Sequence, residues 1–344
     1  MEGGVIGHGA IVRELRMLAT LPEPPHALLL AGPEGLGRTR LATEYALALN
    51  CEADEPGARP CLVCRSCRLI SQHAHPDLAL VAPGDSFCKP RAGESAHERH
   101  PNSRDIRVCQ IRGVAELIAR YPVEARFRVV LIEPAERLNR ESQAALLKTL
   151  EEPPPHTAFV LVSAAPEAIA ETIRSRCRRI DVRPVPTAEL VAGLLERGAD
   201  EATARAIARA ARGRPARALR ILEQPDLLGD ADRLLERCRA VAAAAASERL
   251  AYAGELAERY RRDRTLVAGE LDAWEAFWET RLREAAGRER EAARAAVTAL
   301  RAIAQTRRDL LTNVQPRLAF DLMLLRFPRV TLGSSQEVST RIDD

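Results

Sequence analysis

Four cysteines near the N-terminus have the spacing of a metal-binding loop. Cys51, Cys61, Cys64 and Cys67 form the pattern C-x₉-C-x₂-C-x₂-C. Two overlapping C-x₂-C steps bring thiolates close enough to share one tetrahedral ion, with zinc–sulfur distances of about 2.3 Å. Four thiolates leave no open coordination position, so the pattern predicts a structural Zn²⁺ site rather than a catalytic one. An iron–sulfur cluster and four unliganded thiols are the alternatives.

The remaining cysteines and the nearby histidines do not extend this pattern. His73 and His75 follow the four-cysteine segment, and we expect both on the surface rather than in a ligand set. The other cysteines are scattered along the chain: Cys88, Cys109, Cys177 and Cys238.

A glycine-rich loop at residues 32–39 follows an apolar run at 27–31 and precedes a helical pattern at 41–49. In this strand–loop–helix context, glycines let backbone N–H groups converge on phosphate at the N-terminus of a helix. The loop predicts a nucleotide site formed by Gly32, Gly35, Gly37, Arg38 and Thr39.

Two positions of this site depart from a hydrolytic one. Arg38 stands where lysine acts as a compact charge on the β/γ-phosphates, and a planar guanidinium is not equivalent. The alternative is a general arginine bias, since Lys89 and Lys148 are the only lysines among 51 basic residues. Glu133, at the end of the expected strand 127–133, can hold a metal, but Pro134 has no group that can act as a base. We therefore expect weak or no binding of ATP and Mg²⁺, and no hydrolysis.

Arg176 is a further candidate. It lies in Ser175-Arg176-Cys177, at the end of an expected helix over residues 166–174. The sequence leaves open a solvated basic helix end and an arginine finger that contacts the nucleotide of a neighbouring subunit.

The secondary structure predicted to position these residues changes from mixed strands and helices to helices alone along the chain. Up to residue 184, short Val/Leu/Ile runs alternate with helical patterns, which predicts an α/β domain with a parallel sheet. The remainder predicts only helices, over residues 187–195, 200–211, 216–222, 228–248, 250–264, 266–286, 288–306 and 316–325. The expected strands are residues 27–31, 78–82, 127–133, 157–164 and 179–183, with a surface loop over 84–103.

Composition excludes several classes of protein. The 344 residues predict two or three domains, and no apolar run approaches the roughly 20 residues of a membrane span. The N-terminus lacks a basic and then apolar leader, so we expect a cytoplasmic protein. A net charge of +3 and 3% aromatic residues give no sign of a single-strand binder that stacks bases.

The order of these motifs resembles the AAA+ clamp-loader family of bacterial DNA polymerase III. The resemblance rests on the glycine loop, the four-cysteine insertion, Leu146-Leu-Lys-Thr-Leu-Glu-Glu-Pro-Pro and Ser175-Arg-Cys. It implies an α/β P-loop domain at 1–184 with a zinc-knuckle insertion at 51–67, and a small helical lid at 185–224. An all-α collar domain at 225–332 and a polar tail at 333–344 follow.

The resemblance also implies roles for individual residues. The four cysteines match the zinc ligands of the family, and Arg176 matches its finger, which acts in trans. Gly213-Arg214-Pro215-Ala216 stands where motor subunits carry a lid arginine in Gly-Ser-x-Arg, so Ala216 removes that sensor. The resemblance also gives weak DNA-contact candidates in an expected helix over 104–119, with an ordinary solvated helix face as the alternative: Arg104, Arg107 and Arg112.

The expected function is that of a non-hydrolysing, delta-prime-type subunit. Its expected partners are the gamma/tau and delta subunits, the sliding clamp and primed DNA, with no membrane. An ATP-hydrolysing motor subunit of the gamma/tau type and a zinc-dependent nucleic-acid-binding module are the alternatives.

Overall fold

The structure is a computed structural model that describes residues 5–84, 86–88, 100–262, 264–311 and 314–330. The expected tail at 333–344 and most of the expected surface loop at 84–103 lie outside these residues. The chain divides into two compact units, Met1–Glu223 and Gln224–Asp344, and each is described by itself.

The first unit contains a five-stranded sheet in the order β2-β3-β4-β1-β5, with every neighbouring pair parallel. Its strands are β1 (Ala27–Ala31), β2 (Leu78–Val81), β3 (Arg128–Ile132), β4 (Thr157–Ser163) and β5 (Arg178–Asp181). Each expected strand is present; β1 has the expected ends, and the ends of the other strands differ by at most two residues. The predicted α/β fold with a parallel sheet is confirmed.

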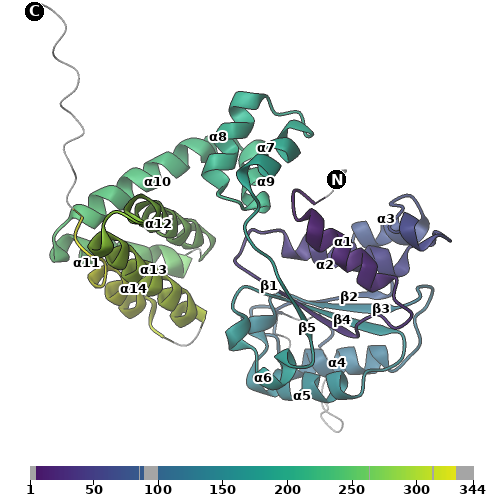
Figure 1. Ribbon diagram of the computed structural model, residues 1–344. Coiled ribbons are helices and arrows are strands. Elements are labelled where there is room, and N and C mark those ends of the chain that lie inside the picture. Colours follow the sequence, from purple (N-terminus) through teal and green to yellow (C-terminus); the bar gives the residue numbers. More distant parts are fainter. Residues whose placement is uncertain (1–4, 85, 89–99, 263, 312–313, 331–344) are drawn as a thin grey trace, which may run out of the picture. The chain divides into compact units, whose positions relative to one another are not determined.

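Helices cover both faces of the sheet (Figure 1). They are α1 (Gly9–Ala19), α2 (Arg38–Asn50), α4 (Val108–Ile118) and α5 (Arg140–Glu151). Side chains of a strand alternate between faces, so Leu28 and Leu30 pack in the core with α1 and α2, whereas Leu29 packs in the core with α4 and α5. Because both faces are apolar, polar chemistry is confined to the ends of the strands.

Two expected helices have different limits. The stretch 166–174 is a 3₁₀ turn, η3 (Pro166–Ala168), followed by the one-turn helix α6 (Glu171–Arg174), because the backbone at Ile169 is extended. Helix α4 begins at Val108 rather than near residue 104, since Ile106 forms a parallel bridge with Leu138 and Arg107 is extended. Short elements absent from the expectation are η1 (Pro56–Ala58), α3 (Arg65–Ser71) and η2 (Ala135–Arg137).

Three short helices complete the first unit: α7 (Thr187–Leu195), α8 (Glu201–Ala211) and α9 (Pro215–Glu223). Gly213, between α8 and α9, contacts the segment that follows β5. The N–H of Val185 in that segment donates to the carbonyl of Gly213 at 2.8 Å. Its φ of 76° is one that glycine adopts without strain, and a Cβ there would lie 2.6 Å from Pro184 Cβ. The close contact fixes where α9 begins, and α9 contributes to the candidate site.

All the regular elements in the described residues of the second unit are helices, as expected. It contains α10 (Asp226–Ala243), α11 (Ala246–Arg262), α12 (Arg264–Ala285), α13 (Arg290–Leu311) and α14 (Pro316–Leu325). Its core is rich in aromatic side chains, including fully buried Trp274, Trp278 and Phe320. Buried Arg249 donates to the carbonyls of Ala242 and Phe327, which holds the residues just after α14 against α10. None of the helices in the described part of the chain has the length and apolar character to cross a membrane.

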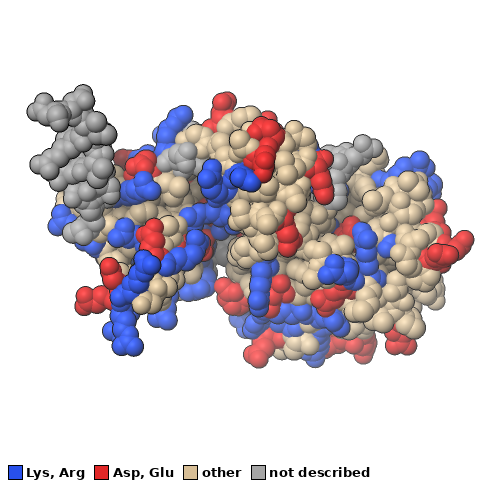
Figure 2. Space-filling view, turned by 45° about the horizontal axis from the view of Figure 1, so that its top comes forward, with Lys and Arg blue, Asp and Glu red and all other residues tan. Residues whose placement is uncertain are grey.

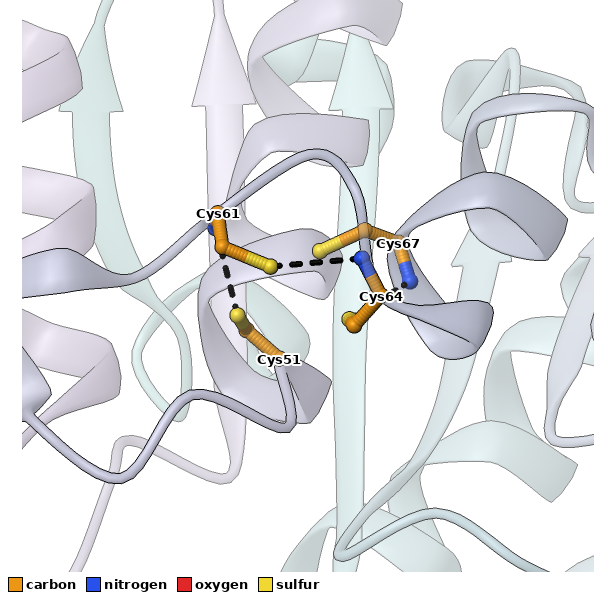
Figure 3. Close-up of side chains that lie close together, drawn as sticks. All are labelled: Cys51, Cys61, Cys64 and Cys67. Atoms are coloured by element: carbon orange, nitrogen blue, oxygen red, sulfur yellow. Dashed lines mark hydrogen bonds between the residues drawn. The ribbon is translucent and has the colours of Figure 1, made fainter.

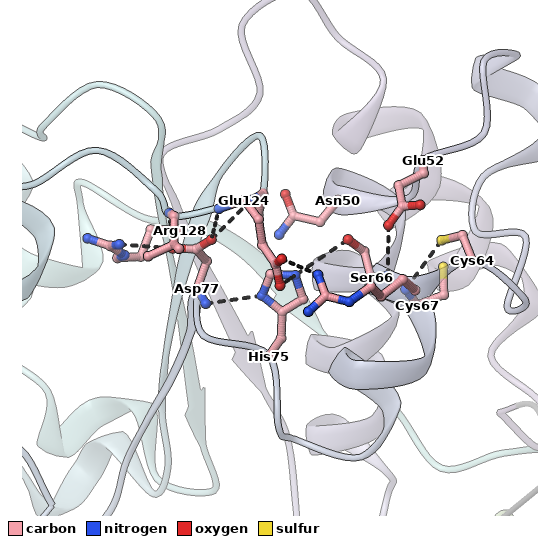
Figure 4. Close-up of polar contacts among 12 residues, drawn as sticks. Asn50, Glu52, Cys64, Ser66, Cys67, His75, Asp77, Glu124 and Arg128 are labelled. Carbon is pink, nitrogen blue, oxygen red and sulfur yellow. Dashed lines mark hydrogen bonds and ion pairs between the residues drawn. The ribbon is translucent and has the colours of Figure 1, made fainter.

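A buried carboxylate fastens the edge of the sheet. Asp77, just before β2, accepts hydrogen bonds from the N–H groups of Val123, Glu124 and Ala125 at 2.8, 2.9 and 3.0 Å. Its Oδ1 also pairs with Arg128 Nη2 at 2.9 Å (Figure 4). Burial alone would raise the pKa of Asp77, but these backbone donors and the guanidinium hold it below its ordinary value.

We expect Asp77→Asn to lower the free energy of unfolding of the first unit by about 3–5 kcal/mol at pH 7, because it leaves Arg128 buried without its counter-charge. A depressed pKa stabilises the fold above the ordinary pKa of aspartate, about 3.9, and this contribution is lost as pH falls through the folded value. The difference from wild type should therefore shrink below about pH 4. Urea unfolding followed across pH measures it.

The matched control is Asp181→Asn, which removes an exposed carboxylate paired with Arg179 on the surface. It should change the free energy of unfolding by no more than about 0.5 kcal/mol. Equal urea midpoints for the two variants would contradict the structural role of Asp77.

Candidate nucleotide site and cysteine clusters

The loop between β1 and α2 has a backbone that requires glycine. Gly35 and Gly37 have φ values of 81° and 82°, and Gly37 is the N-cap of α2. A Cβ on Gly32 would lie 2.2 Å from the carbonyl oxygen of Val182. The glycines thus bring the loop close to β5. They also place backbone N–H groups at the N-terminus of α2, where an anion can accept their hydrogen bonds.

A cavity of about 330 Å³ lies at this loop, at the carboxyl ends of the strands. It joins the loop, the residues after β3 and the first turn of α9. The lining residues are Glu34, Gly35, Gly37, Arg38, Thr39, Glu133, Pro134, Glu136 and Ala216. Every residue that the sequence proposed for the nucleotide site lines this cavity except Gly32, which stands at the start of the loop.

Arg38 is buried in this cavity, with 8% of its surface exposed. Its Nη1 has no hydrogen-bond partner among the described residues. Burial lowers the pKa of Arg38, and the carboxylates of Glu136, Glu133 and Glu34 oppose that shift. Three carboxylates and one guanidinium line the cavity, a balance that disfavours a polyanionic triphosphate without a metal ion.

Glu34 and Glu136 were not identified from the sequence. A signal for Glu136 was present, because it follows Glu133 by three residues and the 3₁₀ turn η2 returns it to the same edge. Its Oε1 accepts a hydrogen bond from the N–H of Ala164 at 3.1 Å, whereas Oε2 is buried with no partner among the residues described.

The groups that would bind Mg²⁺ contact each other. Thr39 Oγ1 donates to Glu133 Oε1 at 2.7 Å. A hydroxyl and a carboxylate are oxygen ligands of the kind that Mg²⁺ takes beside a phosphate. Pro134 follows Glu133 in the cavity wall and offers no base.

Helix α9 closes the loop from the other side. The N–H of Ala216 donates to the carbonyl of Gly35 at 3.1 Å, and His8 Nε2 lies 2.9 Å from the carbonyl of Leu36. The side chain that α9 presents to the cavity here is the methyl group of Ala216, which carries no charge to a phosphate.

Arg176 lies at the other end of the sheet. It comes two residues before β5 begins, whereas the glycine loop follows the end of the parallel neighbour β1. Its Nη2 pairs with Glu151 Oε1 at 2.8 Å, and its Nη1 donates to the carbonyl of Thr172 at 2.8 Å. The side chain is 37% exposed, so the guanidinium is held in place yet reaches solvent.

The three weak DNA-contact candidates are not on one helix. Arg104 precedes α4, Arg107 is its N-cap and Arg112 lies within it. Arg104 and Arg107 are exposed and Arg112 is half-buried. Basic and acidic side chains are interspersed on the face shown in Figure 2, in keeping with the small net charge.

The four predicted zinc ligands converge (Figure 3). Cys51 ends α2, Cys64 caps α3 and Cys67 lies in its first turn. Their sulfur atoms and that of Cys61 all lie within 4.8 Å of one another. Backbone N–H groups point at the sulfurs: Cys61 N donates to Cys51 Sγ at 3.2 Å and Cys67 N to Cys64 Sγ at 3.3 Å.

This donor set fits a tetrahedral thiolate site. N–H donors from Val63 and Cys64 lower the pKa of the Cys61 thiol to about 6, whereas burial raises the pKa of Cys67. Four sulfurs, two from buried and two from half-buried cysteines, with N–H···S hydrogen bonds can hold one Zn²⁺ and offer it no open position.

The segment that carries these cysteines is tied to the sheet by a polar network (Figure 4). The N–H of Ser66, in α3, donates to Glu52, and its hydroxyl lies 3.4 Å from His75 Nε2. His75 Nδ1 accepts from the N–H of Asp77 at 3.0 Å. The expectation that His75 lies on the surface is wrong, because it is buried in this network; His73 is exposed.

Two cysteines that seemed scattered in the sequence are also brought together. Cys88 Sγ lies 3.1 Å from Cys109 Sγ, and His100 completes a second group with metal-ligand geometry. Cys177 and Cys238 are buried at separate places in the two units.

Known proteins resemble this chain most clearly in its first half. Residues 7–186 match the family model described as DNA polymerase III, delta subunit. DNA polymerase III subunit delta' of Haemophilus influenzae is 36% identical over 154 residues, which are 44% of this chain and 41% of the relative. DNA polymerase III subunit gamma/tau of Mycobacterium bovis is 30% identical over 243 residues, 69% of this chain and 39% of the relative.

Among solved structures, a DNA polymerase III gamma subunit-related protein of Thermotoga maritima aligns with 93% of this chain and 99% of its own length. It is 15% identical, with a TM-score of 0.36.

The matched stretches cover about two fifths of the length of these curated relatives. The family model, however, covers more than half of the 344 residues, from just before α1 to just before α7. The chain therefore belongs to the DNA polymerase III delta subunit family and is a delta-prime-like member of the AAA+ clamp loaders.

Proposed function

We propose that this chain is a delta-prime-type subunit of the clamp loader of bacterial DNA polymerase III. It does not hydrolyse ATP itself; it offers Arg176 to the nucleotide of a neighbouring gamma/tau-type subunit. With that subunit, the delta subunit and the sliding clamp, it helps to place the clamp on primed DNA. One observation carries the proposal: the candidate nucleotide site and Arg176 lie at opposite ends of one sheet.

The loop end supports a subunit without hydrolysis. The cavity keeps the glycine loop, Thr39 and Glu133, but it has Pro134 in place of a base and the methyl group of Ala216 in place of a lid cation. Arg38 is buried beside three carboxylates rather than extended toward solvent. A hydrolytic site needs charge stabilisation and an oriented water molecule, and these substitutions remove both.

The position of Arg176 supports action in trans. β5 runs parallel to β1, so Arg176, before β5, is separated from the glycine loop by the length of the strands. The four residues of β5 alone span about 13 Å. An arginine at the far end of the sheet does not reach the phosphate site of its own chain, but it is exposed to a neighbour.

The other assignments follow from the same role. We propose residues 1–184, 185–224 and 225–332 as the α/β module, the lid and the collar. The four-cysteine site holds a structural Zn²⁺ that fastens the 51–67 insertion to α2 and α3. Exposed Arg104 and Arg107 are the candidates for contact with DNA phosphates when the loader encircles DNA.

One observation favours the motor subunit as a second candidate. The gamma/tau relative aligns with 69% of this chain, against 44% for the delta' relative. In that case Arg38 and Glu133 would act as tolerated variants of a hydrolytic site.

We expect Arg176→Ala to leave the chain folded and the loader assembled, because the ion pair that it removes is partly exposed. The hydrolysis rate at the ATPase site that faces Arg176 should fall roughly 10³-fold. Total ATP turnover by the reconstituted loader should therefore lose the fraction that this site contributes. Arg179→Ala removes a nearby exposed arginine on β5 and should leave turnover unchanged. Unchanged turnover in Arg176→Ala would refute the finger.

The isolated chain should hydrolyse ATP no faster than a buffer control, since Pro134, directly after Glu133, offers no base. Arg38→Ala should not alter that rate. Turnover that is measurable in the wild-type chain and abolished in Arg38→Ala would favour the motor candidate instead.

Removing one ligand should also release the metal from the four-cysteine site. We expect Cys64→Ser, purified under reducing conditions, to contain one zinc fewer per chain than wild type by elemental analysis. Cys177→Ser, which alters a buried cysteine outside the cluster, should retain the wild-type zinc content. The same zinc content in Cys64→Ser and wild type would rule out this site.

A further inference from the structure

A second group of metal-ligating side chains lies on the opposite face of the sheet from the four-cysteine cluster. Ligand atoms of Cys88, His100 and Cys109 all lie within 4.8 Å of one another. Cys109 is in the first turn of α4 and is buried, whereas Cys88 and His100 are half-buried. Two thiols and an imidazole from the connection after β2 and from the first turn of α4 therefore lie together.

Contacts that do not involve sulfur hold Cys88 in this position. Gln110, fully buried in α4, donates from Nε2 to the carbonyls of Ala82 and Ser86 at 2.8 and 3.0 Å. A Cβ on Gly113 would lie 1.8 Å from the carbonyl oxygen of Phe87, so only glycine lets the segment pack this closely on the helix. The backbone before Cys88 is thus fixed to α4 by its own packing.

The sulfur atoms are close to the geometry of a shared metal ion. Cys88 Sγ and Cys109 Sγ are 3.1 Å apart. Two thiolates on one tetrahedral Zn²⁺ lie about 3.8 Å apart, given bonds of about 2.3 Å, and side-chain rotation can supply that small change.

We propose that Cys88, His100 and Cys109 form a second site for Zn²⁺, separate from the four-cysteine cluster. Three protein ligands leave the fourth position of a tetrahedral ion to water or another small ligand. The ion would join the segment after β2 and the stretch before α4 to the first turn of that helix. His100 distinguishes this site from a simple dithiol pair, because an imidazole contributes to a metal site and not to a disulfide.

The test is the zinc content of the full chain purified under reducing conditions. His100→Asn and Cys88→Ser should each contain one zinc fewer per chain than wild type, with Cys51, Cys61, Cys64 and Cys67 intact. Because His100 is half-buried and lies outside any helix, its variant should fold. His73→Asn, which replaces an exposed histidine whose φ of 56° asparagine tolerates, is the control and should match wild type.

Cobalt gives an independent measurement. The metal-free chain titrated with Co²⁺ should show thiolate-to-metal absorption from two sites, and His100→Asn should lose the part that belongs to the second. The proposal is overturned if both variants hold as much zinc as wild type. It is also overturned if Cys88 and Cys109 are joined by a disulfide in wild-type protein purified without reductant, since a bridged pair offers no thiolate.

Discussion

A parallel sheet with apolar side chains on both faces leaves the ends of its strands for polar groups, and the positions of the candidate nucleotide site and of Arg176 follow from that constraint. At the carboxyl ends, β1 leads into the glycine loop and β3 into Glu133, so that Thr39 and Glu133 meet although they are 94 residues apart. At the amino ends, Arg176 pairs with Glu151 beside the start of β5. The two ends carry different groups: one holds the candidate nucleotide site, and the other holds the partly exposed guanidinium of Arg176.

The metal-ligating groups depend on the same sheet through its edge. Asp77 ties the start of β2 to Arg128 of β3, and its N–H orients His75, which in turn lies against Ser66 of the cysteine segment. On the opposite face, Gln110 of α4 fastens the residues that follow β2. Loss of one of these buried contacts would destabilise the fold, because the polar group left unpaired has no water to replace its partner.

Periodicity and turn chemistry are local, and they were enough to locate all five strands and the glycine loop. They did not give the start of α4, because Ile106 is held in extended form by Leu138, 32 residues away. The burial of His75 and the meeting of Cys88 with Cys109 likewise arise from packing between segments. At the candidate nucleotide site, the sequence indicated Arg38 and Glu133 but not Glu34 and Glu136, whose effect on Arg38 depends on distance and burial.

A structure of the assembled loader with a slowly hydrolysed ATP analogue tests the central claim most directly. The account predicts that the Arg176 guanidinium contacts the γ-phosphate of the analogue bound to the adjacent gamma/tau-type subunit, while the cavity beside Arg38 holds no Mg²⁺-bound triphosphate. An analogue with Mg²⁺ bound between Thr39 and Glu133 of this chain, with Arg176 still paired to Glu151 and facing no nucleotide, would contradict it.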